Sequence, residues 1–116
     1  MVRVLIMQAT SAHYQPGLDV DFLTEVAQML KTLGHPDRLR IVEFLENGSA
    51  SVTEIHESLG IPQAVASQHL RQMFHLDILE SSREGRRVIY SIANPLVNNM
   101  LHCLEESQRQ HRQVVA

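Results

Sequence analysis

The sequence has few aromatic residues. Aromatic residues make up 4% of the 116 positions and tryptophan is absent, whereas 44% of the residues are hydrophobic. The core must therefore be packed mainly from Leu, Ile, Val, Met and Ala, a composition that favours helices. A chain of this length is expected to form one domain whose core needs no disulfide.

Cysteine, a secretion leader and long apolar runs are also scarce or missing. The single cysteine, Cys103, cannot form a disulfide within the chain, and no charged and then apolar leader is evident. The longest apolar runs, such as "VLIM" at residues 4–7, are far shorter than the roughly 20 residues that span a bilayer. These observations predict a soluble, cytoplasmic protein with no membrane partner.

The chain has no overall excess of positive charge. Its net charge of −3 argues against a nucleic-acid partner, because such domains are often strongly basic. The distribution weakens this objection, since residues 61–93 carry four arginines against three acidic residues. Any basic surface is therefore expected in that region.

Helical periodicity begins at Leu18. Residues 1–17 show no clear period and are expected to form a partly ordered N-terminal arm. Apolar residues from Leu18 to Leu33 are spaced as in a helix with an unusually wide apolar face. A second helix is expected to start at Pro36 and to stop at Asn47-Gly48.

The next two helices are predicted from a cap and a turn. Ser51 and Glu54 have the spacing of a capping box, which predicts the start of a short helix ending near Leu59. Gly60-Ile61-Pro62 then forms a turn, and residues 63–75 form the following helix. A short helix, a turn and a second helix predict a helix-turn-helix.

A hairpin and a last helix complete the chain. Ile78-Leu79 and residues 86–92 are β-branched runs, which predict a two-stranded hairpin with arginines at its tip. Asn94-Pro95 opens the last helix. The prediction is a mainly α, winged helix-turn-helix domain at residues 18–112, with about five helices, one hairpin and a tail at 113–116.

The helix at residues 63–75 has an unusual outward side. Its inner side carries apolar residues: Ala66, Leu70 and Met73. Its outer side carries amide, hydroxyl and guanidinium groups: Gln63, Ser67, Gln68 and Arg71. Such groups can hydrogen-bond to base edges in the major groove of double-stranded DNA, although a plain solvated face is the alternative.

The hairpin tip supplies a second candidate contact. Arg83, Arg86 and Arg87 lie beside Gly85, which allows close approach of the backbone. An isolated run of this kind is usually a solvated tip. Directly after a helix-turn-helix, it favours contact with the sugar-phosphate backbone.

The chain resembles the ArsR/SmtB family of small winged-helix repressors over about residues 20–105. The matching stretches are "LKTLGHPDRLRIVEFL" at 30–45, "SQHLRQM" at 67–73 and "SSREGRRVIYSIANP" at 81–95. The resemblance implies a homodimer that represses transcription at an operator, expected to be an imperfect palindrome. It also implies release by an inducer, which the sequence does not identify.

The chain departs from the family at both frequent metal-sensor sites. Ser51 and Thr53 stand where thiolates often occur, and thiolates are what soft metals prefer. The comparable positions of the last helix are also poor ligands: Asn94, Leu96, Ser107 and Gln110. We therefore expect no metal, no cofactor and DNA binding that is independent of metal.

The first and last helices are the expected dimer interface, because their apolar residues cover too wide an arc for one core contact. The interface residues predicted from these two helices are Leu23, Val26, Leu30, Met100, Leu101 and Leu104.

Other functions and residue roles are compatible with the same sequence. His102 and Cys103 could serve a metal- or redox-responsive repressor, but adjacent helix residues diverge and no third ligand is evident. The favoured interpretation of Cys103 is a small buried residue, and that of His69 a partly buried structural one. A winged helix used only for protein contacts is another alternative. An enzyme is not expected, because phosphate-loop, HExxH and nucleophile patterns are missing.

Overall fold

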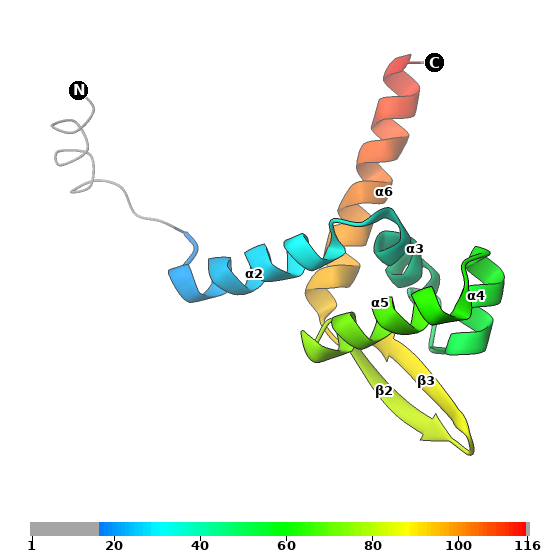
Figure 1. Cartoon of the computed structure of the whole chain (residues 1–116). Helices are drawn as coiled ribbons and strands as arrows, with labels where there is room; N and C mark the ends of the chain where they lie inside the picture. Colours follow the sequence, from blue (N-terminus) through cyan, green and yellow to red (C-terminus); the bar gives the residue numbers. More distant parts are fainter. Residues whose placement is uncertain (1–16, 116) are drawn as a thin grey trace, which may run out of the picture.

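The computed structural model describes residues 17–115, which form five helices and three strands (Figure 1). In chain order the elements are α2 (Val20–Leu33), α3 (Pro36–Leu45), β1 (Ala50–Ser51), α4 (Val52–Leu59), α5 (Gln63–His75), β2 (Leu79–Glu84), β3 (Arg87–Ile92) and α6 (Pro95–Val115). The prediction of a mainly helical winged helix-turn-helix is confirmed. The N-terminal arm expected at 1–17 lies outside the described residues, apart from Gly17.

Local capping explains where α2 and α3 begin. The Phe22 N–H donates to Asp19 Oδ1 over 2.7 Å, which caps α2. Pro36 occupies the first turn of α3, and the Asp37 N–H donates to Nδ1 of His35 over 3.1 Å. His35 therefore caps α3, which starts at Pro36 as predicted.

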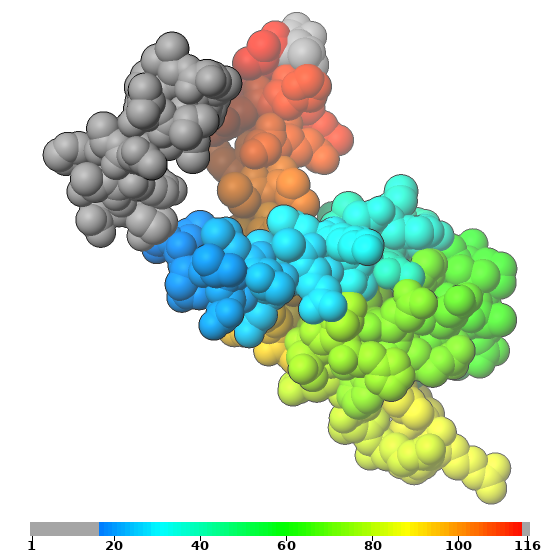
Figure 2. Space-filling model, turned by 60° about the vertical axis from the view of Figure 1, so that its left-hand side comes forward, coloured from blue at the N-terminus to red at the C-terminus, as the bar shows by residue number. Residues whose placement is uncertain are grey.

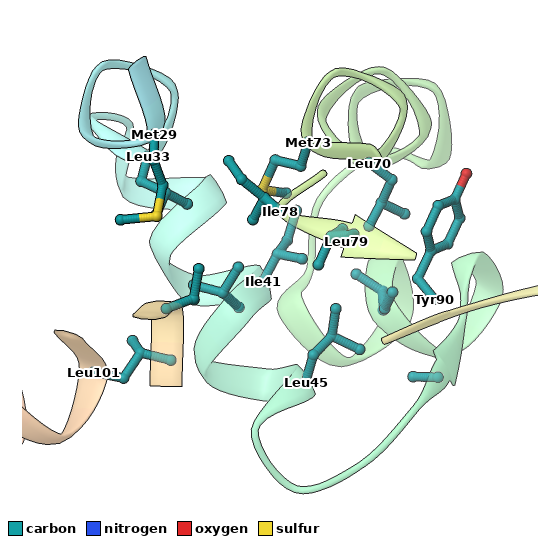
Figure 3. Close-up of a cluster of buried hydrophobic side chains, with 14 residues drawn as sticks. Met29, Leu33, Ile41, Leu45, Leu70, Met73, Ile78, Leu79, Tyr90 and Leu101 are labelled. Carbon is teal, nitrogen blue, oxygen red and sulfur yellow. The ribbon is translucent and has the colours of Figure 1, made fainter. Parts of the chain in front are cut away.

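The core draws residues from helices and strands. Figure 3 shows leucine, isoleucine and methionine side chains converging from α2, α3, α5, α6 and the sheet. Ala66, Leu70 and Met73 of α5 are fully buried, which confirms the predicted inner side of that helix. Tyr90 is the one aromatic residue of the core cluster among the described residues. Packing thus rests on aliphatic side chains, as the composition predicted.

The sheet has one more strand than we predicted. β2 and β3 form the antiparallel hairpin, with Leu79 opposite Ile92 and Glu84 opposite Arg87. β1 adds a third antiparallel strand, in which Ala50 pairs with Tyr90. A strand of two residues is too short to show the alternation of apolar and polar residues that predicts a strand. The capping pattern had also assigned Ser51 to a helix start. The hairpin tip stands away from the rest of the molecule in Figure 2.

Helix α6 continues through Val115, so residues 113–115 of the expected C-terminal tail are helical. Only its first part packs into the core, through Val97 and Leu101, and the remainder projects outward (Figure 1). The radius of gyration is 19.0 Å, well above the roughly 13 Å of a compact chain of about 100 residues. No helix within residues 17–115 combines the length and apolar character needed to cross a membrane.

Candidate nucleic-acid interface

The turn between α4 and α5 is defined by hydrogen bonds at both ends of α4. The Glu54 N–H donates to Ser51 Oγ (3.1 Å) and the Ser51 N–H donates to Glu54 Oε1 (3.0 Å), which completes the predicted capping box. Gly60 ends α4 in the left-handed conformation, with φ of 67°, which a side chain would disfavour. These contacts set the direction in which α5 leaves the turn.

Helix α5 presents the predicted polar side chains to solvent. Gln63, Gln68 and Arg71 are exposed, whereas Ser67 is half-buried. No acidic residue lies in the first turn of α5, and none occurs along Gln63–His75. The outward surface of the helix therefore combines hydrogen-bonding groups with one guanidinium and no negative charge.

The structure brings part of this helix next to the hairpin. Gln63 and Ser67 line the same hollow as Arg86 and Arg87. Gln68, Arg71 and Arg83 do not line that hollow. The interface therefore has a continuous section between α5 and the hairpin, with Gln68 and Arg71 continuing along α5.

The hairpin arginines differ in their surroundings. Arg86 lies with Gly85 in the two-residue turn, where Gly85 has φ of 66°, and Arg83 is exposed on β2. Arg87, predicted to contact phosphate, instead places Nη2 2.8 Å from Oε1 of Glu54. Because this pair is exposed, it is weak and easily screened by salt. Arg87 thus connects the hairpin to α4, a contact that no local pattern could have predicted.

Glu54 remains charged because of its position in the cap. Hydrogen bonds from the backbone and hydroxyl of Ser51 lower the pKa of Glu54, and Arg87 lowers it further. A carboxylate beside the candidate DNA surface would repel phosphate. Pairing with Arg87 partly offsets that charge.

Arg38 connects three elements behind the candidate interface. Its Nε donates to His69 Nδ1 over 2.9 Å and its Nη1 donates to the carbonyl of Thr32 over 3.0 Å. Its Nη2 donates to Oε1 of Gln72. The guanidinium therefore joins the end of α2 to the buried His69 and the exposed Gln72, which lie one turn apart on α5. Neither Arg38 nor Gln72 was singled out from the sequence.

His69 is buried, with 8% of its surface exposed, as the helical period predicted. Its ring lies 4.6 Å from that of His35. Burial lowers the pKa of His69, and the charge of Arg38 lowers it further. The neutral ring can accept the Arg38 hydrogen bond, whereas protonation at Nδ1 would abolish that acceptor.

We expect acid to destabilise the protein partly through His69. Because its pKa is lowered in the folded state, the unfolded chain binds the proton more tightly. Stability is then complete above the ordinary histidine pKa of about 6.5 and falls as the pH drops through that value. Urea unfolding at pH 7.5 and 5.5 measures this effect. The variant His69→Asn keeps an acceptor that does not titrate, so its loss should be smaller; an equal loss would contradict the assignment.

The candidate dimer residues fall into two groups. Leu23, Leu30 and Leu104 are 46%, 50% and 49% exposed, and Val26 and Met100 are half-buried. Leu101 is 5% exposed and belongs to the core of the protomer, so it is removed from the candidate interface. Further exposed apolar residues on or beside α2 were not singled out: Leu18, Val20 and Phe22.

Cys103 is exposed, not buried, in the protomer. The favoured interpretation of this residue as a small buried side chain is therefore wrong for the isolated chain.

Known proteins share this arrangement. Residues 33–82 match a family model described as a helix-turn-helix domain. The transcriptional repressor PagR of Bacillus anthracis is 39% identical over 87 residues, which cover 74% of this chain and 87% of PagR. The transcriptional regulator NmtR of Mycobacterium tuberculosis is 34% identical over 84 residues, which cover 72% of this chain and 70% of NmtR.

Solved structures agree with these sequence matches. The crystal structure of PagR has a TM-score of 0.68 at 38% identity and covers 74% of this chain and 99% of that one. A homodimeric winged helix-turn-helix DNA-binding domain from Mycobacterium bovis has a TM-score of 0.70 at 28% identity, covering 84% and 91%. The chain therefore belongs to the ArsR/SmtB family and is a DNA-binding transcriptional regulator.

Proposed function

We propose that this regulator is a homodimeric repressor that binds an imperfectly palindromic operator in the cytoplasm. The observation that carries the proposal is the polar surface of α5 beside the hairpin arginines. Gln63 and Ser67 share one hollow with Arg86 and Arg87, so base-reading and phosphate-binding groups lie together. The Mycobacterium bovis domain supports the dimer, since that protein is homodimeric.

The two kinds of contact have different chemistry. Gln63, Ser67, Gln68 and Arg71 are proposed to read base edges, because amides and guanidinium groups form paired hydrogen bonds with adenine and guanine. Arg83 and Arg86 are proposed to contact the DNA backbone, with Arg87 contributing less because Glu54 already pairs with it. No group in this surface requires a metal, so DNA binding is proposed to be independent of metal.

The variants Gln68→Ala and Arg86→Ala test this assignment. Losing a base contact should cost about 1 to 3 kcal/mol at one operator position and relax specificity there. Losing the hairpin arginine should weaken binding to all sequences alike and reduce the slope of affinity against salt by about one. Fluorescence anisotropy with the natural operator, single-base variants and unrelated duplexes at several salt concentrations would separate the two effects.

Arg112→Ala is the matched control, because Arg112 is an exposed arginine near the far end of α6. Its affinity and salt slope should equal those of the unmodified protein. Identical effects of Gln68→Ala and Arg86→Ala on every duplex would contradict the division of roles. Absence of salt-dependent duplex binding would favour a module for protein contacts instead.

A further inference from the structure

Three ionisable side chains from two helices meet where α3 ends. Glu46 caps the C-terminus of α3, and His102 and Glu105 lie one turn apart on α6. His102 Nε2 is 3.9 Å from Glu46 Oε2, and its Nδ1 is 3.7 Å from Glu105 Oε1. One donor atom from each residue lies within 4.8 Å of the other two. The fold therefore places two carboxylates, one of them at the end of α3, close to His102.

The two carboxylates are compensated only in part, by the imidazole of His102. The Glu46 side chain is only 14% exposed. Burial raises the pKa of Glu46 and the nearby Glu105 carboxylate raises it further, whereas His102 lowers it. Glu46 and Glu105 line a shallow hollow that Arg40 also lines. Arg40 does not pair with them, because its guanidinium contacts Asp37 and the Leu59 carbonyl. A cation held between the carboxylates would remove this repulsion.

We infer that Glu46, His102 and Glu105 form a binding site for a divalent transition metal, for which Zn²⁺ is the suitable probe. One imidazole and two carboxylates leave a fourth position for water, as in zinc sites with three protein ligands. Bonds of about 2.0 to 2.2 Å place tetrahedral donors about 3.3 Å apart. The distances of 3.7 and 3.9 Å involve different ring nitrogens of His102, whereas one donor atom from each residue lies within 4.8 Å of the others, so shifts of up to about 1.5 Å are required. Reorientation of the exposed imidazole can supply them and direct one ring nitrogen to the metal.

This site differs from both frequent metal-sensor sites of the family. It uses neither Ser51 and Thr53 nor Ser107 and Gln110, and it joins α3 to α6 within one protomer. Its residues do not line the hollow between α5 and the hairpin. The metal is therefore expected to stabilise the junction of α3 and α6 while leaving operator binding unchanged, which goes beyond the proposed function.

Equilibrium dialysis of the full chain against Zn²⁺, after removal of metal with a chelator, tests the site. We expect one zinc per protomer and a higher melting temperature with zinc. Glu46→Gln and His102→Gln should each weaken binding at least about tenfold, since even residues that only support a ligand contribute about tenfold or more. Mg²⁺ should compete only weakly, because imidazole suits Zn²⁺ better than Mg²⁺ and Mg²⁺ gives up its water reluctantly.

His111→Gln and Glu57→Gln are matched controls, since both residues are exposed and lie outside the cluster. Both should bind zinc like the unmodified protein. In the absence of metal, Glu46→Gln should melt no lower than the unmodified protein, because a neutral amide removes the carboxylate repulsion. This measurement separates a loss of ligand from a loss of folding.

Absence of zinc binding, or equal losses in the site variants and the controls, would overturn the inference. A zinc–sulfur signal in X-ray absorption would also overturn it, because it would place the metal on Cys103. Operator affinity measured with chelator and with saturating zinc should agree within about twofold. Because operator binding is measured separately, failure of the metal site leaves the proposed repressor function untouched.

Discussion

The double variant Leu23→Asp with Leu30→Asp is expected to be monomeric and to bind the operator at least about 100-fold more weakly. The two leucines are seven residues apart and thus lie on one side of α2, and both are about half exposed in the protomer. Burying two carboxylates in an apolar interface is strongly unfavourable. A monomer contacts only one half-site and loses the gain of roughly 100-fold or more that linked sites provide.

Light scattering at micromolar concentration and operator titration measure the two effects. The double variant should have the protomer mass of 13.2 kDa and the unmodified protein twice that mass. Val114→Asp is the control, because Val114 is an exposed apolar residue near the far end of α6. An unmodified protein with the mass of a protomer, or a double variant that still dimerises, would rule out this interface.

Arg38→Met is the second substitution with a large expected effect. Methionine keeps much of the side-chain volume but removes the donors to Thr32, His69 and Gln72. A partly buried acceptor left without its donor costs about 1 to 3 kcal/mol. We expect a loss of that size in the free energy of unfolding. Operator affinity should fall as well, because α5 loses two of its connections to the α2–α3 corner.

Urea unfolding and operator titration of the same preparation would measure both losses. Arg40→Met is the matched control, since Arg40 is an exposed arginine two positions away that contacts Asp37 and the Leu59 carbonyl. Its unfolding free energy should change by less than about 1 kcal/mol. If Arg38→Met and Arg40→Met behave alike, Arg38 does not position α5.

The sequence predicts features whose causes are local. The inner and outer sides of α5 follow from a period of 3.6 residues, and Ser51 with Glu54 marks a helix start because the cap spans only three residues. Leu101 shows the limit of this reasoning. Periodicity places it on an apolar stripe with Leu104, but only three-dimensional packing shows that Leu101 faces the protomer core while Leu104 is exposed.

Contacts between distant segments were not predictable from the same patterns. Arg87 with Glu54, Arg38 with His69, and Glu46 with His102 each join different elements. A helical period gives the direction of a side chain from its own axis but not which group of another helix lies opposite. For the same reason the sequence did not predict β1, since its pairing with Tyr90 depends on a distant strand.

The hairpin has a further consequence for how new binding preferences can arise. In β2 only Leu79 is buried, and the remaining residues through Glu84 are exposed. Lengthening, shortening or recharging the distal hairpin therefore leaves the hydrophobic core intact, whereas changes on α5 risk disturbing Leu70 and Met73 on its other side. The proposed contacts of the hairpin with the DNA backbone can thus diversify at little cost to folding, while the proposed base contacts of α5 are restricted to substitutions that the core tolerates.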